Sequence, residues 1–93
     1  MSEARQRVDV WLFRARLCKT RADASRLISE GGVRLMHNGQ PRRLEKPSVE
    51  VEPGDVLVLP GAKGLRTIEV KGLGPRRGPA AEARALYREA PPE

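Results

Sequence analysis

The chain has 93 residues and a formal net charge of +6 at pH 7, with one cysteine and one histidine. The length predicts one small folded domain, and the two counts exclude an internal disulfide and a zinc site built from cysteine and histidine alone. No stretch approaches the roughly 18 consecutive apolar residues of a membrane span, so we expect a soluble, cytoplasmic protein with no membrane partner. We also expect no cofactor.

The positive charge is concentrated in the first half of the chain. Residues 1–43 contain ten basic and four acidic side chains, whereas residues 44–93 contain eight of each. Charge that serves only solubility would be spread evenly, so the asymmetry favours a polyanionic partner. Nine of the ten basic residues are arginine, whose planar guanidinium suits phosphates and base edges. A basic surface without a ligand is the alternative.

Apolar residues recur at helical spacing over residues 8–18 and predict a first helix. They form two stripes, which is typical of a helix packed between two neighbours. Trp11 and Phe13 lie at positions typical of a core, and stacking on nucleic-acid bases is the alternative. Asp9 falls in the first turn, where the helix dipole favours a carboxylate, and we expect it to orient Arg5 or another nearby arginine.

Thr20 followed by Asp23 resembles a capping box, which predicts that a second helix begins at Arg21. Gly31-Gly32 is expected to end this helix. Its apolar face consists of Ala24, Leu27 and Ile28. The free amides at the start of the helix, beside two cationic side chains, predict an anion site.

The rest of the chain predicts a small, curved, mainly antiparallel sheet. Short alternating or apolar segments at residues 33–35, 49–51, 56–59 and 66–71 indicate strands, with 56–59 as a central strand buried on both faces. Asn38-Gly39 predicts a tight hairpin, and Pro53-Gly54 predicts a type II turn. Residues 72–79 are expected to form a mobile basic connection, and residues 80–90 a C-terminal helix.

Two sets of motifs resemble a known family, the S-four RNA-binding domain named after a small-subunit ribosomal protein. The order that resembles it is Arg7-Val8-Asp9-x-Trp11-Leu12, Arg16-Leu17-x-Lys19-Thr20-Arg21, Leu27-Ile28, Gly31 and Val33-Arg34. Lys46-Pro47-Ser48 and the segment from Arg76 to Tyr87 are similar to the family of the bacterial ribosome-associated heat-shock protein fifteen. Met36-His37 depart from the pattern, because the family turns sooner at this point.

The resemblance spans residues 7–90 and implies an α+β fold. In such a fold a two-helix αL-type RNA-binding motif packs on a small, curved, mainly antiparallel sheet, with a short C-terminal helix. Residues 1–72 would form the S-four-like RNA-binding domain. Residues 73–93 would form a basic loop, the short C-terminal helix and a tail.

For function, the resemblance implies a protein that is not an enzyme and that docks on structured ribosomal RNA of the large subunit. It would act in rescue or recycling of stalled large subunits that carry peptidyl-tRNA after stress. The alternatives are a ribosome-quality-control factor that stabilises tRNA on the large subunit, and a helix-turn-helix DNA-binding protein. We expect a monomer whose partners are large-subunit ribosomal RNA and tRNA.

The predicted binding site contains basic and polar side chains from the two helices and the hairpin that follows them. No residue is predicted to be catalytic or to bind a metal, because the sequence shows no paired acids, activated nucleophile or phosphate-binding loop. The predicted RNA-binding residues are Arg7, Arg16, Lys19, Thr20, Arg21, Ser25, Arg34, Asn38, Arg42, Arg43 and Lys46.

Overall fold

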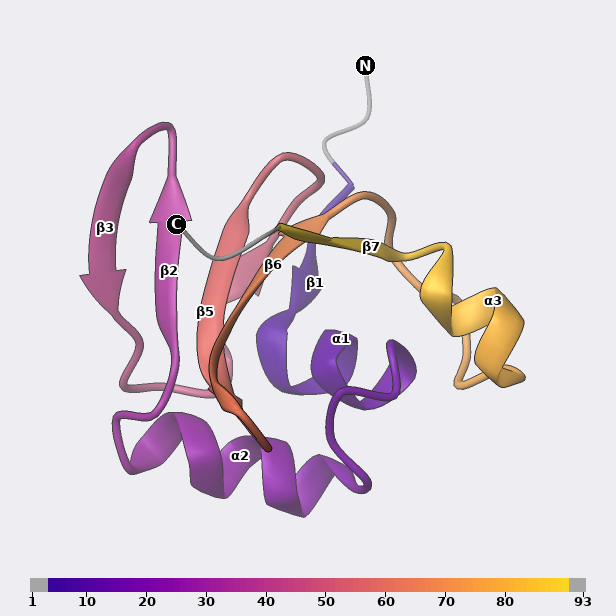
Figure 1. The fold of residues 1–93 in the computed structure, drawn as a ribbon, viewed down its shortest axis with the longest axis horizontal. Coiled ribbons are helices and arrows are strands. Elements are labelled where there is room, and N and C mark those ends of the chain that lie inside the picture. The colour runs from indigo at the N-terminus through magenta and orange to yellow at the C-terminus, as the bar shows by residue number, and fades with distance from the viewer. Residues whose placement is uncertain (1–3, 91–93) are drawn as a thin grey trace.

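A five-stranded antiparallel sheet, with two helices packed against one of its faces, forms the body of the protein (Figure 1). The structure is a computed structural model that describes residues 4–90. In chain order its elements are β1 (Gln6–Arg7), α1 (Val8–Arg14), α2 (Arg21–Ser29), β2 (Arg34–His37), β3 (Gln40–Arg43), β4 (Glu50–Val51), β5 (Val56–Gly61), β6 (Gly64–Val70), α3 (Ala80–Arg84) and β7 (Tyr87–Ala90). The strand order in the main sheet is β3-β2-β5-β6-β7, and β1 pairs with β4 separately. The predicted α+β fold class is confirmed.

The hydrophobic core lies between α1, α2 and the sheet. Trp11 is fully buried there, and its Nε1 donates a hydrogen bond of 2.8 Å to the carbonyl of Gly72. Trp11 is therefore a core residue and has no free face for a base. Phe13 is half-buried beneath the guanidinium of Arg77, which lies 4.8 Å from the ring centroid. None of the helices that the structure describes is long and apolar enough to cross a membrane.

The first helix ends four residues earlier than the apolar pattern predicts. Arg16 has a φ of +61°, in the left-handed region, and its amide donates to the carbonyl of Phe13. The amide of Leu17 donates to the carbonyl of Leu12, which completes a Schellman motif. Arginine is rarely found in this conformation, so the sequence gives no signal for the end of α1.

The second helix begins and ends as predicted. The Thr20 Oγ1 accepts a hydrogen bond of 2.9 Å from the amide of Asp23, which confirms the cap. Gly31, with a φ of +81°, ends α2 in a second Schellman motif. Ile28 is fully buried, whereas Leu27 is only partly buried and packs at the edge of the core.

Both predicted turns are confirmed. Asn38 and Gly39 have φ values of +53° and +78°, which is the type I′ pattern of a two-residue hairpin between β2 and β3. Gly54 has a φ of +100°, and the amide of Asp55 donates to the carbonyl of Glu52 across the type II turn. β5 is the central strand of the sheet, but only one of its faces is fully buried, because Val58 on the other face is partly exposed.

The C-terminal segment differs most from the prediction. Residues 72–78 do not form a free connection, because side chains from β1, from α1 and from the turn after α1 donate hydrogen bonds to the carbonyls of Gly72, Gly74 and Gly78. A Cβ at Gly74 would lie 2.9 Å from Leu86 and 3.2 Å from Arg14, so only glycine allows this close approach. The predicted helix over residues 80–90 ends at Arg84. Residues 87–90 instead form β7, which pairs with β6.

The different burial of Ile28 and Leu27 predicts different effects on stability. Replacement of Ile28 by alanine leaves a cavity in the core, so we expect a loss of about 2–5 kcal/mol in the free energy of unfolding. Leu27→Ala should cost clearly less, because part of its side chain is already in water. Urea unfolding followed by circular dichroism measures both changes. Equal losses for the two variants would contradict the packing described here.

Candidate nucleic-acid interface

A buried carboxylate connects the two helices at the surface that the sequence predicts to bind RNA. Asp9 in α1 is 1% exposed, and its two oxygens accept hydrogen bonds from Arg7 Nε (3.1 Å), Arg7 Nη2 (3.0 Å) and the amide of Val10 (2.8 Å). The Oδ2 also accepts from Ser25 Oγ at 3.3 Å and lies 3.6 Å from Arg21 Nη2. We call Asp9, Arg7, Arg21 and Ser25 the Asp9 cluster.

The electrostatics of the Asp9 cluster keep its carboxylate ionised. Burial alone would raise the pKa of Asp9, but the hydrogen bond from Arg7, the amide of Val10 and the positive charges of Arg7 and Arg21 together lower it. The sequence predicted that Asp9 would orient an arginine. Its partners are Arg7 and Arg21, whereas Arg5 pairs with Glu52.

The geometry directs positive charge outward. The side chains of Arg7 and Arg21 are 47% and 54% exposed, although the carboxylate between them is only 2% exposed. An approaching anion therefore meets two guanidinium groups, while the acid that orients them lies beneath the surface. Such pre-oriented guanidinium groups suit charge-assisted hydrogen bonds to phosphate oxygens.

Two further predicted residues adjoin the Asp9 cluster at the start of α2. Lys19 is exposed and precedes the cap residue Thr20, whose hydroxyl is used by the amide of Asp23. Arg21 is the first residue of α2, so its backbone amide and that of Ala22 belong to the unpaired first turn. The side chains of Lys19 and Arg21 thus lie next to the positive end of a helix dipole.

Lys46 lies in a segment that contacts the start of α1. The amide of Val8 donates to the carbonyl of Val49 at 2.7 Å, and the amide of Asp9 donates to the carbonyl of Pro47 at 3.4 Å. The segment containing Lys46 therefore satisfies the first amides of α1 and adjoins the Asp9 cluster. The predicted residues brought together here are Arg7, Lys19, Thr20, Arg21, Ser25 and Lys46.

Arg16 has a different environment from the cluster. Its Nε donates a hydrogen bond of 2.7 Å to the carbonyl of Gly78, so the side chain fastens the C-terminal segment to the end of α1. Arg14 does the same at the carbonyl of Gly74, and Arg77 donates to the carbonyl of Phe13. The sequence predicts neither role for Arg14 and Arg77, because contacts between residues 60 or more positions apart leave no local signal.

The remaining predicted residues belong to the β2–β3 hairpin. Arg34 and Arg43 are cross-strand neighbours, Arg42 is opposite Leu35, and Asn38 is in the turn. The Arg43 side chain lies over Gly31 at the end of α2, where a cation complements the helix dipole. α2 has nine residues and is therefore about 13 Å long.

β2 begins and β3 ends beside the C-terminal end of α2 (Figure 1). Arg34 and Arg43 thus lie at the opposite end of α2 from Arg21 of the Asp9 cluster. The structure places most of the predicted residues in two groups, one at each end of this helix. Arg16 and Asn38 lie outside both, because Arg16 contacts the C-terminal segment and Asn38 is in the turn at the far end of the hairpin. That these residues contact one RNA stays a prediction.

Comparisons with known proteins find the family that the sequence motifs resemble. A family model described as the S4 domain matches residues 6–57. Heat shock protein 15 of Escherichia coli K12 is 45% identical over 83 residues, which cover 89% of this chain and 59% of that protein. The heat shock protein 15 homolog of Haemophilus influenzae is 36% identical over 89 residues, which cover 96% of this chain and 64% of that protein. The chain therefore spans less than two thirds of the length of these two relatives.

A solved structure is also similar. Heat shock protein 15 of Vibrio cholerae, described as trimeric, superposes with a TM-score of 0.79 at 37% sequence identity. The match covers 94% of this chain and 83% of that chain. The shared fold thus includes the C-terminal segment as well as the region matched by the S4 model.

The lowered pKa of Asp9 predicts a pH-dependent effect of its removal. Asp9→Asn should lower the free energy of unfolding at pH 7 by about 1–2 kcal/mol, because hydrogen bonds to a charged group are lost and solvent already screens the two arginines. A carboxyl with a lowered folded-state pKa stabilises the fold above its unfolded-state pKa. This contribution disappears as the pH falls through the folded-state value.

The difference between wild type and Asp9→Asn should therefore shrink below about pH 4. Urea unfolding at several pH values between 3 and 7 measures this difference. Glu45→Gln, at an exposed carboxylate, serves as the control and should leave stability unchanged at every pH. A difference between wild type and Asp9→Asn that does not vary with pH would contradict the role given to the Asp9 charge.

Proposed function

Because the chain belongs to the S4 domain family and, within it, to the heat shock protein 15 proteins, we propose that it binds structured RNA and catalyses no reaction. The Asp9 cluster carries this proposal, since one buried acid orients two exposed guanidinium groups beside the start of α2. The acid itself accepts four hydrogen bonds and is ionised. It has no proton to donate, and its oxygens are occupied, which suits a positioning role and not acid–base catalysis.

The RNA that we propose is ribosomal RNA of the large subunit. Similarity to the heat shock protein 15 proteins supports this choice. The role that we propose there is the rescue or recycling of stalled large subunits that carry peptidyl-tRNA after stress. A quality-control factor that stabilises tRNA on the large subunit would use the same surface. A DNA-binding role receives less support, because family membership favours RNA.

The monomeric state stays a prediction for this chain. The similar Vibrio cholerae protein is described as trimeric. The sheet of the present structure also exposes two large apolar side chains, with Met36 37% and Leu65 76% exposed. Sedimentation-velocity measurements at several protein concentrations determine the mass directly and test the monomer.

The proposal predicts that the protein co-sediments with isolated large ribosomal subunits in a salt-dependent manner. Each phosphate that an arginine or lysine neutralises releases counterions. With roughly 5–7 such contacts, log K plotted against log salt concentration should have a slope of about −3.5 to −6. Sucrose-cushion sedimentation at several salt concentrations gives the slope, with isolated small subunits and duplex DNA as controls. A slope near zero would refute an electrostatic mechanism, and equal affinity for duplex DNA would refute selectivity for RNA.

A substitution at Arg21 separates RNA contact from folding. Arg21→Ala should weaken RNA binding by about 1–3 kcal/mol, because charge-assisted hydrogen bonds to phosphate are lost. Its melting temperature should stay close to that of the wild type, since the side chain is 54% exposed. Arg26→Ala is the matched control on the same helix, because Arg26 pairs with Asp23 outside the Asp9 cluster.

Filter binding and thermal melting, measured on both variants, test this prediction. The control should show a much smaller loss of affinity than Arg21→Ala. If Arg21→Ala melts early and retains its affinity for RNA, Arg21 is a structural residue. The docking surface then has to be sought at the hairpin arginines.

A further inference from the structure

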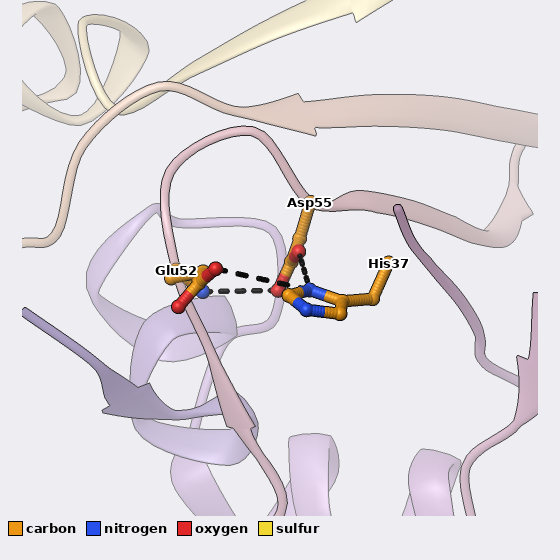
Figure 2. A group of neighbouring side chains, drawn as sticks. All are labelled: His37, Glu52 and Asp55. Carbon is orange, nitrogen blue, oxygen red and sulfur yellow. Dashed lines mark hydrogen bonds and ion pairs between the residues drawn. The ribbon is translucent and has the colours of Figure 1, made fainter. Parts of the chain in front are cut away.

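Three polar side chains outside the Asp9 cluster meet at the turn end of the β2–β3 hairpin, which is the end opposite Arg34 and Arg43. His37 is the last residue of β2, and Glu52 and Asp55 are the outer residues of the turn between β4 and β5. The imidazole Nδ1 of His37 lies 2.5 Å from Asp55 Oδ1 and 3.9 Å from Glu52 Oε2. Figure 2 shows both carboxylates directed toward the same ring nitrogen.

Neighbouring groups fix the orientation of the two carboxylates. The Oδ2 of Asp55 accepts a hydrogen bond of 3.0 Å from the amide of Glu52, which leaves Oδ1 facing His37. The Oε1 of Glu52 pairs with Arg5 Nε at 3.2 Å, which leaves Oε2 facing the same point. Outer partners of this kind orient the ligands in known metal sites.

The imidazole alone cannot satisfy both acids. Nδ1 carries at most one hydrogen, and its position favours donation to Asp55. The Oε2 of Glu52, at 3.9 Å, is beyond hydrogen-bond distance from the ring. One nitrogen and two carboxylate oxygens thus lie within 4.8 Å of one another. A single N–H hydrogen bonds to one of these oxygens only, whereas a cation between the three atoms would contact all of them.

We propose that His37, Glu52 and Asp55 bind one Zn²⁺ ion. Zinc accepts imidazole nitrogen together with carboxylate oxygen at about 2.0–2.2 Å, whereas calcium and magnesium prefer oxygen alone. Zinc takes the lone pair of Nδ1, so the bound imidazole is neutral and carries its one hydrogen on Nε2. A neutral ring with its hydrogen on Nδ1 reaches this state by moving that proton to Nε2 through solvent, whereas an imidazolium releases the Nδ1 proton to water. The side chains of His37 and Glu52 are 43% and 29% exposed, so a water molecule can complete the tetrahedral shell.

Only small movements are needed to reach this geometry. Tetrahedral ligands at these bond lengths lie about 3.3 Å apart. The contact between Nδ1 and Asp55 therefore has to lengthen by about 0.8 Å, and that between Nδ1 and Glu52 has to shorten by about 0.6 Å. The two carboxylate oxygens lie within 4.8 Å of each other, so they have to approach by at most about 1.5 Å. Side-chain rotation of His37 and Glu52 at the surface supplies these changes, while Asp55 is buried and stays in place.

The bound ion would join the hairpin to the β4–β5 turn. His37 precedes Asn38, so zinc would fix the base of the turn that carries this predicted RNA-binding residue. The inference goes beyond the proposed function and does not depend on it. The sequence alone gives no sign of this metal site, because the acids follow His37 by 15 and 18 residues and only the fold brings the three side chains together.

Isothermal titration of the full, tag-free chain with zinc chloride, after treatment with a chelator, tests the proposal. We expect one zinc ion per chain, bound at micromolar concentration, and an affinity at least about tenfold weaker in His37→Gln and in Glu52→Gln. Asp55→Asn is not used, because Asp55 also holds the turn through the amide of Glu52. Circular dichroism establishes that each variant is folded.

Two matched controls exclude other sites. Glu45→Gln removes an exposed carboxylate outside the group, and Cys18→Ser removes the thiol, whose pKa is raised by burial. Both should bind zinc as the wild type does. The chain has a single histidine, so its imidazole carbon–proton signals in the NMR spectrum report directly on ligation and should shift with one equivalent of zinc.

Two results would overturn the proposal. The first is the absence of saturable zinc binding by the wild type, which would leave His37, Glu52 and Asp55 as an ion-pair group only. The second is unchanged binding by folded His37→Gln together with unshifted imidazole signals. That result would place the zinc elsewhere on the chain.

Discussion

The proposed binding surface depends on the contacts that the buried carboxylate of Asp9 makes with donors from the two helices. A buried charge without partners costs several kcal/mol, and the fold supplies donors to this acid from both helices. Arg7 reaches it from the residue before α1, and Arg21 and Ser25 reach it from α2. The angle between the helices and the position of the cations are thereby linked. The same bonds that hold the helices together orient the groups offered to phosphate.

The structure also changes the meaning of the charge asymmetry. The excess of arginine in residues 1–43 favours a polyanionic partner, but several of these arginines make contacts within the protein. Arg14 and Arg16 donate to backbone carbonyls of residues 74 and 78, and Arg43 lies over the end of α2. Arg26 pairs with Asp23. Net charge therefore indicates the class of partner, but it does not give the number of phosphate contacts, because some of these arginines bind other parts of the protein.

Local signals in the sequence predicted local structure well. The Thr20 cap and the Asn38-Gly39 turn are specified within a few residues, and the structure has them as predicted. The end of α1 at Arg14 was not predicted, because it depends on the rare left-handed conformation of Arg16. Strand β7 was not predicted, because it exists only through pairing with β6. The site follows the same rule. The motif predicted its basic residues, whereas the contacts of Asp9 with Arg21 and Ser25 could be seen only in the fold.

α2 sets the spacing between the two groups of predicted RNA-binding residues. It is capped by Thr20 at one end and closed by a Schellman motif at Gly31 at the other, so its length of about 13 Å is fixed. The Asp9 cluster lies at the first end, and Arg34 and Arg43 lie at the second. A flexible strand could adjust to any spacing between two cationic groups, but a folded RNA has phosphates at set distances. A rigid spacer between the groups therefore favours a structured RNA partner over an unstructured one.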